Sequence, residues 1–276
     1  MKTVNNQSKN AAYQKFEVLK TNRNKRYRYG EFFVEGVRNL NEAAANGWAF
    51  SALLYTPETP LSAWAREMLS SVRAEAHYAL SAALMAELSG KTDTSELLAV
   101  VKMRQDDLSA LPMREVPLFA LFDRPSNKGN LGTVIRSCDA LGVDGLILTG
   151  HAVDLYDPEV VVAGMGSFFH MPVIRVPDTE RAIGWMADRK EQDPAFQIVG
   201  TTAHRETNAE DVDFSRPTLL MIGNETDGLS RGLKETCDVL ATIPLCETSS
   251  ASSLNVACAA TALLYEAARQ RRTIHR

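Results

Sequence analysis

The sequence predicts an α/β protein of two domains, the second built on a mainly parallel sheet. The chain has 276 residues, 45% apolar and 23% charged, which suits a globular protein of about two domains. Short apolar runs alternate with helical patterns, and such strands are typical of a parallel sheet covered by helices on both faces. We predict one domain over residues 1–106 and another over 114–276, joined by a polar segment that contains Pro112.

The first domain begins with a basic segment, interpreted as an N-terminal arm that contacts RNA. Residues 1–30 hold eight lysines and arginines against one acid, Glu17, and the aromatic residues Tyr13, Phe16, Tyr27 and Tyr29 lie among them. Arginine and aromatic side chains stack on unpaired bases, and lysine neutralises phosphates. The alternative is a first helix whose aromatic side chains pack on the domain while the basic ones stay in water.

The rest of the first domain alternates between strands and helices. The apolar and polar periodicity predicts strands at 31–35, 49–55 and 97–103 and helices at 36–45, around 61–74 and at 80–88. Gly47 is placed to end the first of these helices.

In the second domain, predicted strands alternate regularly with predicted helices. Strands are predicted at 116–122, 145–148, 197–202, 218–222 and 239–245, and helices from about 130 and over 253–271. Ser253 is expected to cap the last helix, because its hydroxyl can accept from an unpaired N–H of the first turn. That helix is rich in small residues, which suits close approach of another backbone.

Three loops follow predicted strands and carry polar residues. They read NKGNLGTVIR from Asn127 to Arg136, IGNETDGL from Ile222 to Leu229, and IPLCETSSASSLN from Ile243 to Asn255. In this order the loops resemble the three signature motifs of the SpoU (TrmH) family of RNA ribose 2′-O-methyltransferases, in the knotted SPOUT class. The likeness covers roughly the last 160 residues, and FFVEG near Phe32 resembles the ribosomal-protein-like RNA-binding domain that precedes many such enzymes.

The resemblance implies a fold and a reaction. It implies a C-terminal trefoil-knotted domain with its knot within 219–255, although proteins in general do not thread loops. The implied reaction moves the methyl group of S-adenosylmethionine to a ribose 2′-hydroxyl of structured RNA, ribosomal RNA ahead of transfer RNA. A cytoplasmic homodimer that needs no metal is implied as well.

The resemblance also assigns site residues. The implied catalytic set is Arg136, Asn130, Glu225, Ser253 and Asn255. The implied cofactor-binding set is Thr202, Ile222, Gly223, Asn224, Gly228, Ile243, Leu245, Ser253 and Leu254.

Arg136 has two possible chemical roles. The family proposal makes it the base that removes the hydroxyl proton, but a guanidinium has a pKa above about 12. On physical grounds we prefer a role in which Arg136 stays charged and stabilises a neighbouring phosphate and the developing alkoxide. A salt bridge to Asp139 or Asp144 is the structural alternative.

Two segments depart from the family pattern. Cys246, Glu247 and Thr248 stand where relatives often have a glycine, in a loop that is also about two residues longer. Residues 162–164, Val-Ala-Gly, stand where many relatives have Arg-Ala-Ser, which puts the identity of the substrate in doubt rather than the chemistry.

Composition excludes several other classes of protein. The net charge is −4, so any RNA contact must use local patches, and no apolar run reaches the ~18 residues of a membrane span. The four cysteines lack metal-site spacing, and the two in predicted helices, Cys138 and Cys258, are expected to be buried. A catalytically silent RNA-binding factor stays possible, whereas an NAD or nucleotide enzyme lacks its glycine-rich phosphate loop.

Overall fold

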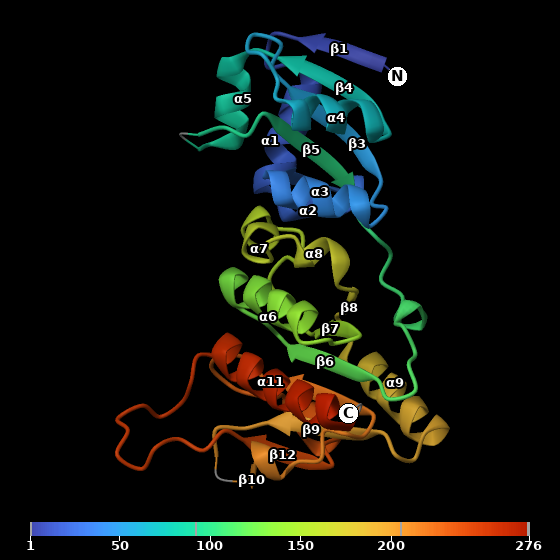
Figure 1. Cartoon of the computed structure of the whole chain (residues 1–276), viewed down its shortest axis with the longest axis vertical. Coiled ribbons are helices and arrows are strands. Elements are labelled where there is room, and N and C mark those ends of the chain that lie inside the picture. The colour runs from blue at the N-terminus through green and yellow to red at the C-terminus, as the bar shows by residue number, and fades with distance from the viewer. Residues whose placement is uncertain (1, 92, 205, 275–276) are drawn as a thin grey trace. The chain divides into compact units, whose positions relative to one another are not determined.

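A computed structural model of the chain describes residues 2–91, 93–204 and 206–274 (Figure 1). It divides into two compact units, Met1–Arg104 with Asp154–His170 and Gln105–Val153 with Met171–Arg276. All the predicted site residues belong to the second unit. The predicted division at 106 and 114 stays a prediction, and residues 154–170 pack in the first unit. Among the described helices, none is long and apolar enough to cross a membrane.

The first unit contains a mixed five-stranded sheet in the order β1-β4-β3-β5-β2. Its strands are β1 (Lys2–Asn6), β2 (Glu31–Glu35), β3 (Phe50–Tyr55), β4 (Ala74–Leu80) and β5 (Leu97–Lys102). β1 and β3 run parallel to β4, while β5 runs antiparallel to β2 and β3. The predicted strands β2, β3 and β5 are confirmed, whereas β1 and β4 were not predicted. The sequence of β1 is polar, and this strand forms by pairing with β4.

Five helices of this unit come from its first ninety residues. They are α1 (Ala11–Thr21), α2 (Arg23–Tyr29), α3 (Val37–Ala45), α4 (Ala63–Ser71) and α5 (Ala82–Ser89). Tyr13 and Phe16 of α1 are buried against α5 and the sheet, so the interpretation of these two rings as base-stacking is wrong. Burying an aromatic ring removes a large apolar area from water, and this favours packing of the ring in the core over its exposure for stacking on a base. Tyr29 stays 44% exposed, with Lys15 beside its ring.

Residues 154–170 complete the first unit with α7 (Pro158–Ala163) and α8 (Ser167–His170). Arg26 of α2 is buried and donates through Nε to Asp154 Oδ2 at 2.7 Å. The Trp48 indole donates to the carbonyl of Phe169 at 2.8 Å. A buried charge requires a partner of opposite charge. These contacts therefore hold residues 154–170 against the first hundred residues of the same unit.

The second unit is built on a seven-stranded sheet in which every described pair of neighbours is parallel. Its order is β10-β12-β9-β11-β6-β7-β8. The bounds are β6 (Leu118–Asp123), β7 (Gly145–Thr149), β8 (Val173–Val176), β9 (Gln197–Thr201), β10 (Thr207–Asn208), β11 (Thr218–Ile222) and β12 (Val239–Thr242). The parallel sheet and the five predicted strands are confirmed, and β8 and β10 are additional.

Helices cover both faces of this sheet, as expected. They are α6 (Lys128–Ala140), α9 (Thr179–Gln192), α10 (Arg231–Glu235) and α11 (Val256–Ile274). Phe119 and Leu121 of β6 pack on α9 and α10, together with Leu219 and Met221 of β11. Successive side chains of a strand point to opposite faces, so the even-numbered residues of β6 and β11 face the other layer, where α6 and α11 lie side by side (Figure 1). The knot within 219–255 stays a prediction.

Candidate active site

The three motif loops follow β6, β11 and β12, whose carboxyl ends lie at one edge of the sheet because the strands are parallel. Ligands of open parallel sheets bind at this edge. The first loop enters α6 at Asn127, whose Oδ1 accepts from the N–H of Asn130 at 2.9 Å. This cap fixes the first turn of α6 and therefore the position of Asn130.

Glu225 joins the second loop to the first. Its carboxylate accepts from the N–H and hydroxyl of Ser126 at 3.0 and 2.7 Å and from the N–H of Asn127 at 3.1 Å. Asn130 Nδ2 donates to the same carboxylate at 3.3 Å. Burial alone would raise the pKa of Glu225, but the hydrogen bonds from Ser126 and Asn130 outweigh burial and hold the pKa below its ordinary value. Glu225 is therefore ionised at neutral pH and is a poor base.

Asn255 joins the third loop to the first. Its Nδ2 donates to Asn130 Oδ1 at 3.2 Å, so Asn130, Glu225 and Asn255 form one hydrogen-bonded chain across the three motifs. Asn255 Oδ1 also accepts from the N–H groups of Ala257 and Cys258. The N-cap of α11 is thus Asn255, and the expectation that Ser253 caps it is wrong. The helix begins at Val256, which places Ser253 outside its first turn.

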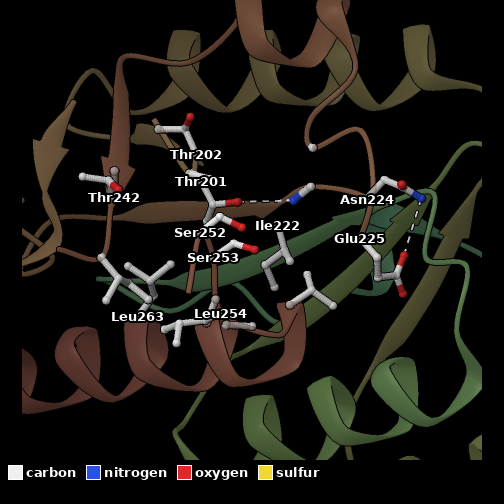
Figure 2. A pocket seen from close by; sticks show the side chains of 18 of the residues that line it. Thr201, Thr202, Ile222, Asn224, Glu225, Thr242, Ser252, Ser253, Leu254 and Leu263 are labelled. Atoms are coloured by element: carbon white, nitrogen blue, oxygen red, sulfur yellow. Dashed lines mark hydrogen bonds between the residues drawn. The ribbon is translucent and has the colours of Figure 1, made fainter. Parts of the chain in front are cut away.

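A cavity of about 250 Å³ opens beside this chain of side chains (Figure 2). Every residue assigned to cofactor binding lines it, namely Thr202, Ile222, Gly223, Asn224, Gly228, Ile243, Leu245, Ser253 and Leu254. Glu225 lines it as well. Figure 2 shows Asn224 and Glu225 at one end of the cavity and Thr242 at the other.

Several residues that line the cavity were not predicted from the sequence. Thr201 and Thr242 end β9 and β12 beside the motifs, and Thr201 Oγ1 accepts from the N–H of Gly223 at 3.3 Å. Val256, Ala260 and Leu263 line the cavity from α11. Their spacing of four and three residues is that of one helix face, so helical periodicity could have found them.

Arg136 stands apart from the cavity. It lies on α6 six residues after Asn130, about 9 Å further along the helix axis at ~1.5 Å per residue. Its side chain is exposed, is not among the lining residues, and makes no hydrogen bond or ion pair with the described part of the chain. The salt-bridge alternative is wrong, since Asp144 pairs with Arg114 and Arg136 pairs with neither acid.

Two cysteines differ in exposure. Cys138 is fully buried, and burial raises the pKa of its thiol, as expected of an apolar neighbour of the sheet. Cys258 is exposed on α11, so the expectation of burial is wrong for it. Among the residues with described positions, no group of three His, Cys, Asp or Glu could hold a metal ion.

The lining of the cavity combines apolar side chains with a few hydroxyl groups, which suits a nucleoside. Leu245, Leu254 and Leu263 offer apolar contact for a ring, and Thr201 and Thr242 offer hydroxyls. Gly223 allows the backbone of the second loop to fold closely, because a Cβ there would lie 2.5 Å from the Gly228 carbonyl carbon. Apolar walls with a few placed polar groups are typical of cofactor sites.

Comparison with known families identifies the class. The model of the SpoU rRNA methylase family matches residues 117–265, and the model of the SpoU L30e-like domain matches residues 10–99. The chain belongs to the SpoU family of RNA ribose 2′-O-methyltransferases, in the SPOUT class, and S-adenosylmethionine is its methyl donor. The resemblance found in its motifs is confirmed.

Particular relatives match nearly the whole chain. A 23S rRNA (uridine(2479)-2′-O)-methyltransferase of Streptomyces viridochromogenes is 48% identical over 96% of this chain and 91% of its own length. The crystal structure of the SpoU methyltransferase AviRb from that organism, in complex with AdoMet, has a TM-score of 0.87, is 46% identical, and covers 96% of this chain and 100% of AviRb. An AdoMet-bound rRNA methyltransferase from Sinorhizobium meliloti has a TM-score of 0.83 at 28% identity and covers 97% of this chain and 98% of its own.

Proposed function

We propose that this enzyme methylates the 2′-hydroxyl of one ribose in the large-subunit ribosomal RNA, in the cytoplasm. The observation that carries the proposal is the 48% identity with a 23S rRNA 2′-O-methyltransferase over almost the full length of both chains. A likeness that includes the N-terminal residues favours a shared RNA, because accessory domains select substrates while the catalytic domain supplies the chemistry. This is the reason to prefer ribosomal RNA to transfer RNA.

In the proposed mechanism the protein contributes mainly alignment. S-adenosylmethionine supplies a methyl group already activated as a sulfonium, so positioning provides much of the acceleration. The residues lining the cavity hold the cofactor, and the linked Asn130, Glu225 and Asn255 hold the three loops in register. Ser253 and Asn255 face the RNA side, and Glu225 acts as an ionised anchor rather than as a base.

Arg136 is the proposed contact to the RNA at the reacting sugar. Its exposure leaves the guanidinium free to pair with a phosphate beside the target ribose and to stabilise charge that develops on the 2′-oxygen. A guanidinium that stays protonated cannot take the hydroxyl proton. The proton therefore passes to solvent water while the O–C bond forms and the bond between the methyl group and the sulfonium sulfur breaks.

We propose further that the enzyme is a homodimer. Cys258, Ala262 and Tyr265 are exposed along one stripe of α11, and Tyr265 is 54% exposed. Small residues with one aromatic ring suit a close, symmetric helix contact. A second subunit on this surface would also explain why Arg136 is exposed and remote from the cavity of its own subunit. The mass of the protein in solution tests this directly.

The substrate proposal is tested by mapping ribose methylation in total RNA from cells with and without the gene. We expect one 2′-O-methyl group to disappear from the large ribosomal RNA and to return when the gene is supplied again. An unchanged ribosomal RNA with a lost methyl group in transfer RNA would contradict the choice of substrate. Unchanged methylation in all RNA would favour the catalytically silent RNA-binding factor.

A further inference from the structure

Arg124 has a backbone conformation that its side chain disfavours. It directly follows β6 and has a φ of 48°, in the left-handed region. Outside glycine, this region is uncommon and costs free energy, so neighbouring contacts must hold it. Arg124 packs against Gly150, where a Cβ would lie 2.5 Å from Arg124 Cγ.

The side chain of Arg124 neutralises a fully buried carboxylate. Its Nε and Nη2 donate to Asp123 at 3.2 and 3.0 Å, and Asp123 has no exposed surface. The same carboxylate accepts from the N–H of Ser230 at 2.7 Å, just after the second motif. Asp123 is the main cause of a raised pKa at Arg124, so the guanidinium stays charged.

Arg124 also touches both ends of the bend formed by the second motif. Its carbonyl accepts from Asn224 Nδ2 at 2.7 Å, and its Nη2 donates to the carbonyl of Gly228 at 3.0 Å. Asn224 and Gly228 in turn exchange backbone hydrogen bonds at 3.0 and 3.1 Å. The left-handed φ is what aims the carbonyl and the guanidinium of one residue at the two ends of one bend.

We propose that Arg124 is a positioning residue for the cofactor cavity. The bend that it fixes supplies Gly223, Asn224 and Gly228 to the cavity lining, while Arg124 is not itself among the lining residues. Without the guanidinium the bend loses its side-chain contact at Gly228 and Asp123 becomes a buried charge without its cation, while the main-chain carbonyl of residue 124 still accepts from Asn224. The folded enzyme then binds S-adenosylmethionine more weakly, although no group that touches the cofactor has changed. This inference rests on the assignment of the cavity to that cofactor.

The test compares Arg124→Met with Arg175→Met by calorimetric titration of S-adenosylmethionine and by thermal unfolding. Arg175 is the matched control, because it pairs with Asp106 in the same unit and neither residue lines the cavity. We expect Arg124→Met to bind the cofactor about tenfold or more weakly, as for a lost charged hydrogen bond. The control should lower the unfolding temperature and keep the affinity. At saturating cofactor, Arg124→Met should regain most of its methyl transfer.

An Arg124→Met protein that is folded and binds the cofactor as tightly as the wild type would overturn the proposal. Equal losses of affinity in both variants would overturn it too, because they would show a general loss of structure. If Arg124→Met does not fold, Arg124→Lys serves, since a lysine keeps the charge beside Asp123 but cannot also span to Gly228. Failure of the wild-type protein to bind the cofactor would instead refute the assignment of the cavity.

Discussion

Asn255 donates from its side-chain amide to Asn130 Oδ1 at 3.2 Å, while its own Oδ1 accepts from the N–H of Ala257 at 2.9 Å. One side chain therefore begins α11 and ties it to the first turn of α6. The position of the third motif relative to the first depends on this residue.

Two substitutions separate these roles of Asn255. Asn255→Ala should lower the free energy of unfolding by about 1 kcal/mol through the lost cap and should reduce methyl transfer. Asn255→Asp keeps the capping oxygen but cannot donate to Asn130, so stability should stay near the wild type while transfer falls. Denaturant unfolding and a methyl-transfer assay check both variants. Wild-type transfer by Asn255→Asp would show that the link to Asn130 is dispensable.

Glu225 should contribute a pH-dependent part of the stability. Its pKa is below the ordinary 4.5, so its stabilisation is fully present above that pH and is lost as the pH falls through the folded-state pKa. The difference in unfolding free energy between wild type and Glu225→Gln should therefore shrink as the pH is lowered through this range.

A second carboxylate distinguishes the role of Glu225 in the site from a general electrostatic contribution to stability. Asp213 also has a lowered pKa, through a hydrogen bond from Ser215, but it does not line the cavity. Asp213→Asn should show the same direction of pH dependence and keep full transfer, whereas Glu225→Gln should lose transfer at neutral pH. Comparable transfer by the two variants would remove Glu225 from the site.

Gly223→Ala should abolish cofactor binding. The added Cβ would lie 2.5 Å from the backbone of Gly228 and Leu229, which cannot move without opening the bend. Gly184→Ala is the control, because Gly184 lies in α9 with nothing within 4 Å of its Cβ position, and the change should stabilise the helix by up to about 1 kcal/mol. Calorimetric titration measures both, and tight binding by Gly223→Ala would contradict the geometry of the bend.

Local patterns predicted much of this molecule. The strands β2 and β11 have the bounds predicted for them, because short apolar runs flanked by polar residues report directly on buried strands. The motif residues around Asn130, Glu225 and Asn255 meet as implied, since parallel strands deliver their loops to one edge.

Features that depend on distant partners could not be predicted. Ser253 and Asn255 are both good capping residues, and only the path of the third loop decides that Asn255 is used. The sequence around Tyr13 and Phe16 is compatible both with rings that stack on a base and with rings that pack in the core, where they are found. The burial of Arg26 depends on Asp154, 128 residues later, which no local pattern can indicate.

Arg136→Ala should separate catalysis from cofactor binding. Removal of a group that stabilises transition-state charge costs about 10²–10³ in rate. Because Arg136 is exposed and outside the cavity lining, the affinity for S-adenosylmethionine should stay constant and the stability should change by less than about 0.5 kcal/mol. Arg231→Ala, which removes another exposed arginine of the same unit, should leave the rate unchanged. An unaltered rate in Arg136→Ala would exclude it from the mechanism.

The most direct measurement uses purified protein, S-adenosylmethionine with a labelled methyl group, and large-subunit ribosomal RNA that lacks modifications. The RNA is digested to nucleosides and the labelled product is identified. We expect label in a single 2′-O-methylated nucleoside. Label on a base, or cofactor binding without any transfer to RNA, would contradict it.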